Sequence, residues 1–131
     1  MNKLNESLQV VQGIAPQDIG TADVTGSYLP MSGARQILAT LTTASLTAGK
    51  IATIELLQAT SSAGAGAKAL KTAVSGTAPV GNGAVTVSVG AMDDEFDTNN
   101  GYVYYAVKVT CDENGKLGAV TVARGDLRYS L

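Results

Sequence analysis

Three small residues in a short loop offer the first candidate chemistry in this sequence. The stretch "SSAGAGAKALK" covers residues 61–71, and its Gly64, Gly66 and Ala69 satisfy the relaxed dinucleotide-binding pattern G-x-G-x-x-G/A. Such glycines bind a phosphate only where a helix follows, because the helix N-terminus directs N–H groups and a dipole at the anion. Glycines and a proline recur over residues 76–83, which leaves no room for that helix. We therefore interpret the pattern as a surface loop of small residues.

The second candidate is the acidic stretch "MDDEFDTNNGY", because side-chain oxygens are the ligands that calcium prefers. These oxygens belong to Asp93, Asp94, Glu95, Asp97, Asn99 and Asn100. The spacing does not match the EF-hand loop: with Gly101 at the sixth position, Phe96 takes the first and no glutamate follows at the twelfth. Nothing nearby suggests the groove and aromatic platform of a glycosidase. We expect a solvated connection with one helical turn from Asp93 to Thr98 ending at Gly101, and no metal or other cofactor.

The residue types that are missing argue against catalysis. The sequence has no histidine and one cysteine, Cys111, so the usual general base, the commonest metal ligand and an activated thiol are all lacking. Its nine basic residues are scattered and the net charge is -2, which gives no basic face for nucleic-acid phosphates. We predict that the protein is not an enzyme and binds neither nucleic acid nor a small-molecule substrate.

The beginning of the chain bears on location. Residues 1–20, "MNKLNESLQVVQGIAPQDIG", contain no apolar run of about seven or more residues, so they predict neither a secretion signal nor a membrane segment. We therefore expect synthesis in the cytoplasm of the producing cell and no membrane partner.

Alternating apolar residues predict strands throughout residues 34–131. The clearest segment, "GYVYYAVKVTC", directs Val103, Tyr105, Val107, Val109 and Cys111 toward a core. Weaker alternation marks residues 34–49, 51–60, 83–91 and 117–125, and a short strand is expected at 126–131. The Asn-Gly turn in "DENGK" predicts a hairpin between the strands on either side of it. Strands without a long helix indicate an all-β fold, an antiparallel β-sandwich or barrel.

Residues 1–33 lack this periodicity and contain repeated turn residues. We expect them to form an extended N-terminal arm that precedes a β-sandwich domain at 34–131. An apolar arm needs a surface to lie on, either the protein's own sheet or a neighbouring subunit. Deleting residues 1–20 is accordingly expected to leave a folded domain.

Two sets of polar residues are candidates for contacts between subunits. Tyr102 and Tyr104 share the face of their strand that points away from the core, and exposed tyrosines commonly anchor interfaces. The alternative is a sandwich in which both faces of that strand are covered. Arg124 and Arg128 flank Asp126 and are expected to pair across the terminal turn.

The order of these features resembles the small capsid decoration, or cement, proteins of tailed bacteriophages. The resemblance covers about residues 8–131, and its most specific parts are the "LQAT" and "GAGAKAL" segments, the "GYVYYAVKVT" strand and the ending "VARGDLRY". It implies a β-sandwich or jelly-roll-like subunit, a homotrimer, that binds the major capsid protein on the outside of the virion capsid. Such a protein stabilises the shell by binding and carries out no reaction.

The resemblance also implies roles for particular residues. The arm would cross between capsid subunits and contact them through Leu4, Leu8, Val10, Val11, Ile14, Ile19 and Leu29, whereas Tyr102, Tyr104, Arg124 and Arg128 would face neighbouring protomers. Two other functions stay open on the residues alone. A tail-tube or head-completion protein of the virion would form rings of six or more subunits. A carbohydrate-binding module would need exposed aromatic platforms, and the sequence lacks tryptophan.

Overall fold

The computed structural model describes residues 8–125, and residues 1–7 and 126–131 lie outside that description. The described chain is almost entirely β-structure, which confirms the predicted fold class. Its strands are β1 (Leu8–Asp18), β2 (Val24–Thr25), β3 (Leu29–Pro30), β4 (Gln36–Thr43), β5 (Ile51–Ala59), β6 (Lys68–Ala69), β7 (Val74–Thr77), β8 (Thr86–Met92), β9 (Tyr104–Cys111) and β10 (Leu117–Gly125). Two single-turn 3-10 helices, η1 (Asp93–Glu95) and η2 (Thr98–Asn100), separate β8 from β9.

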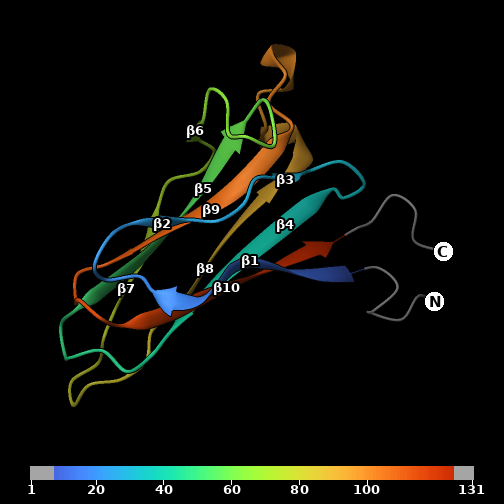
Figure 1. Cartoon of the computed structure of the whole chain (residues 1–131). Coiled ribbons are helices and arrows are strands. Elements are labelled where there is room, and N and C mark those ends of the chain that lie inside the picture. Colours follow the sequence, from blue (N-terminus) through green and yellow to red (C-terminus); the bar gives the residue numbers. More distant parts are fainter. Residues whose placement is uncertain (1–7, 126–131) are drawn as a thin grey trace, which may run out of the picture.

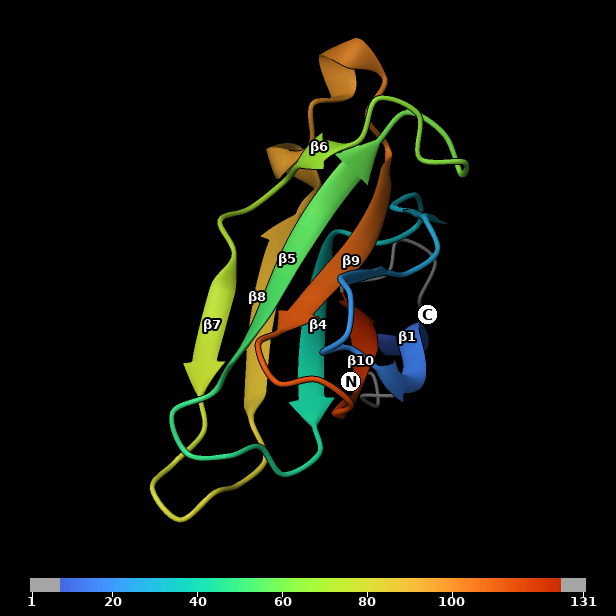
Figure 2. The same cartoon turned by 60° about the vertical axis from the view of Figure 1, so that its left-hand side comes forward.

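The strands form two antiparallel sheets packed face to face (Figures 1 and 2). Sheet A has the order β1-β10-β4-β8, and sheet B has the order β2-β9-β5-β6, with β3 also on β9 and β7 also on β5. We count β2 and β3 together as one interrupted strand, and β6 and β7 together as another. The first strand then pairs with the last strand, the second with the second-last, the third with the third-last, and the two middle strands with each other. This is the pairing of one long hairpin rolled into two sheets, the jelly roll.

The core lies between the sheets and follows the alternation seen in the sequence. In β4 the side chains of Ile37, Ala39 and Leu41 are buried while their neighbours face outward. The same pattern holds for Ile54 and Leu56 in β5. The rest of the core includes Ile14, Ile19, Leu46, Val85, Val89, Tyr105, Val107, Val109, Cys111, Val120 and Val122. Period-two patterning therefore predicted the buried face of most long strands correctly.

The predicted hairpin between the last two long strands is wrong. A turn is present, with Gly115 at φ 75°, but β9 belongs to sheet B and β10 to sheet A. The turn therefore crosses from one sheet to the other. An Asn-Gly pair dictates a local chain reversal, whereas the strand that pairs with β10 is decided by burial over the whole sheet. Its partners are β1 and β4.

The expected boundary at residue 33 is not found in the described chain, because the segment assigned to an arm is built into both sheets. Strand β1 pairs with β10 from Leu8 opposite Gly125 to Asp18 opposite Leu117. Ile14 and Ile19 are only 3% and 1% exposed. Of the two surfaces considered for this segment, it uses the protein's own sheets. Register shifts on both sides of Ile14 interrupt the alternation, which is why periodicity did not reveal a strand here.

Candidate functional site

The glycines of the dinucleotide-like pattern support tyrosine packing instead of phosphate binding. Gly64 and Gly66 have φ of 81° and 65°, and the chain continues into the two-residue strand β6, so no helix N-terminus faces the loop. A Cβ added to Gly64 would lie 2.7 Å from Cε1 of Tyr28. The Tyr102 hydroxyl donates a hydrogen bond to the Gly66 carbonyl oxygen at 2.9 Å. The loop interpretation is confirmed, and its glycines make room for two rings.

Replacing Gly64 with alanine tests this packing. We expect Gly64→Ala to lower the free energy of unfolding by about 2–5 kcal/mol, the sum of about 1–2 for a left-handed residue and about 1–3 for overpacking. Gly33→Ala is the matched control, since Gly33 has φ 88° with nothing within 4 Å of its added Cβ, and should lose only the first part. Urea denaturation of both variants measures the difference, and equal losses would contradict the tyrosine contact.

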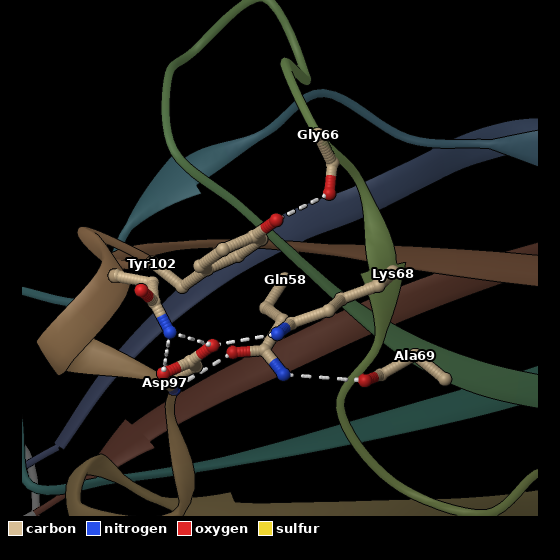
Figure 3. A network of polar contacts seen from close by, with 7 residues as sticks. Gln58, Gly66, Lys68, Ala69, Asp97 and Tyr102 are labelled. Carbon is tan, nitrogen blue, oxygen red and sulfur yellow. Dashed lines mark hydrogen bonds and ion pairs between the residues drawn. The ribbon is translucent and has the colours of Figure 1, made fainter.

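Below this loop, a polar network joins β5, β6 and the segment between β8 and β9 (Figure 3). Gln58 is 6% exposed; its amide nitrogen donates to the Ala69 carbonyl at 3.2 Å, and its amide oxygen accepts from the Asp97 backbone N–H at 2.9 Å. Lys68 forms an ion pair with Asp97 at 2.6 Å and lies 4.2 Å from the centre of the Tyr102 ring. A buried amide with both ends bonded holds these segments in one arrangement.

The acidic stretch is divided between two environments. Asp97 pairs with Lys68 and Glu95 with Lys71. These lysines hold the pKa of each carboxyl below its ordinary value, through hydrogen bonds that favour the charged form. A lowered folded-state pKa means that this stabilisation is present above the ordinary carboxyl pKa and is lost as the pH falls through the lowered one. Asp93 and Asp94 instead line a pocket.

The single helical turn predicted from Asp93 to Thr98 is replaced by two short 3-10 helices. Helices η1 and η2 cover most of the expected span, and Gly101, at φ 81°, ends η2 as the sequence indicated. Among residues 8–125, no group of three or more His, Cys, Asp or Glu side chains is placed to hold a metal ion.

The pocket is a depression of about 370 Å³ between the β3–β4 connection and the segment containing η1 and η2. It is lined by Met31, Ser32, Asp93, Asp94, Phe96, Thr98, Tyr102 and Val103. Val103 was expected in the core but is 43% exposed, because β9 begins one residue later at Tyr104. The pocket therefore combines aromatic and aliphatic walls with two carboxylates, and no basic residue of the described chain, 8–125, lines it.

A second candidate surface is the outward face of sheet A. Apart from Asp18 at the end of β1, the outward positions of its four strands carry no charged side chain. The register places Val10, Ala123, Leu38 and Gly90 in one row across the sheet. Val10 is 66% exposed and Leu38 47%. Threonine, serine and glutamine fill the next row, so the face is uncharged and apolar toward one end.

The apolar end of this face is uneven. Depressions of about 290 and 270 Å³ lie on either side of Leu38, and the exposed Met92 borders the first of them. Met92 ends β8 and is followed directly by Asp93, so this end of the face adjoins the pocket. The outward face of sheet B differs, because Lys108 lies opposite Glu55 and pairs with Asp23 at 3.6 Å.

The predicted contact residues of the N-terminal segment are dispersed. Ile14 and Ile19 are core residues, so they offer no surface to a partner. Val11 and Leu29 are partly buried against the core, and Leu8 lines the second depression beside Leu38. Val10 alone of this group is largely exposed, and Leu4 lies outside the described residues.

The predicted tyrosine and arginine contacts are also separated. Tyr102 belongs to the pocket and the polar network, whereas Tyr104 is half-buried in β9. The Arg124 guanidinium donates to the Gln9 side-chain oxygen at 2.7 Å and to the Ser32 carbonyl at 2.6 Å, so it joins β1 to the β3–β4 connection within one subunit. Arg128 and the expected strand at 126–131 lie outside the described residues.

Sequence reasoning missed two features of these surfaces. Gln58 carried a usable signal: it follows Ala52, Ile54 and Leu56 on the apolar face of its strand, and a polar residue on that face needs a buried partner. The row through Leu38 had no signal in the sequence, because its residues come from four strands and no single strand shows how it is aligned with the other three.

Comparisons with known proteins show similarity of fold and no family. No family model matches the sequence, and no curated protein matches it. One similar chain comes from the structure of infectious bursal disease virus Gx strain, with 9% identity and a TM-score of 0.48. The match covers 94% of the present chain and 33% of the viral chain. The SPBc2 prophage-derived protein YomS is 10% identical with TM-score 0.43 and coverages of 89% and 91%. The cellulose-specific carbohydrate-binding module CBM28 is 12% identical with TM-score 0.42 and coverages of 92% and 78%.

Similarities this distant do not transfer a function, because one fold hosts many. Within residues 8–125, no helix is long and apolar enough to cross a membrane.

Proposed function

We propose that this protein is a virion structural protein that binds the outside of a phage capsid, through the major capsid protein, and stabilises the shell. Two observations support the proposal. The sequence resembles phage decoration proteins over about residues 8–131, and the jelly roll is a fold that serves as a rigid building block in many assemblies. Synthesis in the host cytoplasm and assembly as a homotrimer belong to the same proposal.

The observation that carries the proposal is the uncharged outward face of sheet A. The centre of a protein interface is depleted of charge, because each buried charge must be stripped of water. Four strands present such a face here, with Val10, Leu38 and Met92 exposed at one end. The exposed apolar residues at this end of the face form a patch of the kind that marks interaction sites.

The mechanism requires binding alone. A protein that binds the assembled shell more tightly than its separated subunits shifts the equilibrium toward the shell, by an amount that grows with the logarithm of its free concentration. A rigid sandwich suits this task, since little conformational entropy is lost when a preformed face docks.

Co-sedimentation with undecorated phage heads tests the proposal. We expect the wild-type protein to pellet with the heads and to raise the temperature at which they open. Leu38→Asp should reduce binding at least about tenfold, because it places a charge at the centre of the apolar row. Val80→Asp is the matched control, since Val80 is fully exposed in a loop and its replacement should change nothing.

The outcomes are distinct. Loss of binding in Leu38→Asp, with a thermal unfolding transition close to that of the wild type, supports docking through sheet A. Failure of the wild type to bind any tested head type overturns the capsid assignment. The mass of the protein in solution separates a trimer from the rings of six or more expected of a tail-tube or head-completion protein.

A further inference from the structure

We infer that the pocket beside η1 receives a long basic side chain, lysine or arginine, from the protein on which this chain docks. The pocket has the two parts that such a side chain recognises. Its walls come from Met31, Phe96 and Val103, and its acidic rim comes from Asp93 and Asp94. A lysine or arginine places its methylene stem on apolar surface and its charge at a polar edge.

The charge balance around the pocket favours a cation. The neighbouring acids Glu95 and Asp97 are neutralised by Lys71 and Lys68, which approach from β6 and the residues after it. No hydrogen bond or ion pair joins the Asp94 carboxylate to any of residues 8–125. The Asp94 carboxylate therefore gives the rim a negative charge, and none of the lining residues between 8 and 125 is basic. An incoming cation would gain the charge-assisted hydrogen bonds that Asp94 lacks.

The pocket is large enough to hold one long side chain. Its volume of about 370 Å³ lies at the small end of the about 300–1,000 Å³ that ligand sites span. Phe96 and Met31 are only 6% and 5% exposed, so the walls are anchored in the core and keep their form before a partner arrives. Such preorganised anchor pockets concentrate binding energy in a few residues.

The position of the pocket agrees with a docking role. Asp93 follows Met92 directly in the chain, and Met92 belongs to the apolar end of sheet A. A partner that covers Leu38 and Met92 would thus bring its edge to the rim of the pocket. The identity of that partner rests on the proposed function, whereas the preference for a basic side chain rests on the pocket alone.

The first test uses the pocket by itself. The ¹⁵N-labelled full chain is titrated with N-acetyl-arginine amide and, as a neutral probe of nearly the same shape, N-acetyl-citrulline amide. We expect the arginine derivative to shift the backbone signals of Asp94, Thr98 and Val103 with saturation in the millimolar range, roughly what one side chain supplies. The citrulline derivative should shift them far less.

Variants add the second test. Asp94→Asn should weaken binding of the arginine derivative and binding to phage heads about two- to fivefold each, the worth of one partly exposed ion pair. Asp23→Asn is the matched control, since it removes one negative charge from the outward side of sheet B and should leave both measurements unchanged.

The two proposals fail differently. Equal shifts with both probes, or no shifts, overturn the basic-side-chain pocket even where the wild type binds heads. Saturable arginine binding that Asp94→Asn weakens supports the pocket even where no head is bound, in which case the capsid assignment fails and the pocket stands.

Discussion

Ile14→Asp is expected to unfold the protein. Ile14 is 3% exposed between the sheets, and its backbone lies opposite Val120 in the β1–β10 pairing. A carboxylate there either stays charged without a partner or takes up a proton, and both cost several kcal/mol. A domain of this size has about 5–15 kcal/mol of stability in total, so far-UV circular dichroism and urea denaturation should show most of the chain unfolded or strongly destabilised.

The same substitution four residues earlier is the control. Val10 belongs to the same strand but is 66% exposed on the outward face of sheet A, so Val10→Asp should cost about 1 kcal/mol or less. Ile14→Ala gives an intermediate measure and should cost about 2–5 kcal/mol through the cavity it leaves. An Ile14→Asp protein with wild-type stability would show that β1 is not part of the sandwich.

Because β1 is part of sheet A, binding by the N-terminal segment is better tested with single substitutions than with a deletion. Deleting residues 1–20 was expected to leave a folded domain, but the deletion removes β1 and Ile19 and exposes the edge of β10. Loss of binding after such a deletion would report unfolding. Val10→Asp separates the two effects, because it alters the docking face and leaves the core intact.

How far the sequence predicts the fold depends on how regular each strand is. Strands β4 and β8 alternate throughout, β5 alternates as far as Gln58, and β9 alternates except at the buried Ala106, so most of their buried positions follow from the period of two. Strand β1 has an irregularity on each side of Ile14, and each one moves the next residues to the other face. Local pattern also did not decide the pairing of β10, which depends on residues about 80 to 115 positions away.

The candidate surfaces were harder to predict than the fold. Tyr102 is predicted at an interface because exposed tyrosines commonly anchor interfaces; in the structure it lines the pocket, and its contact with another protomer stays a prediction. The acidic stretch is visible as a group in the sequence. Its division into paired and pocket-lining carboxylates depends on Lys68 in β6 and Lys71 just after it, which pair with Asp97 and Glu95 although they lie more than twenty residues earlier in the chain. The row through Leu38 exists only once four strands are in register.

The second large effect is expected at Gly26, which follows β2 and holds the two sheets close together. Its N–H donates to the Val107 carbonyl of β9 at 2.9 Å, and a Cβ added to it would lie 2.0 Å from the Gly13 carbonyl oxygen of β1. Because backbone atoms occupy both sides, an alanine here must push β1 away from β9. We expect Gly26→Ala to lower the free energy of unfolding by about 3 kcal/mol or more, at or above the upper end of what overpacking costs.

Ser27→Ala is the control for this substitution, because Ser27 is the exposed next residue and should change stability by less than about 0.5 kcal/mol. Urea denaturation of both variants provides the measurement. A Gly26→Ala protein as stable as Ser27→Ala would mean that β1 and the segment after β2 are not in contact. Strand β1 also carries Val10 on the proposed docking face, so we expect Gly26→Ala to disturb that face as well as the stability.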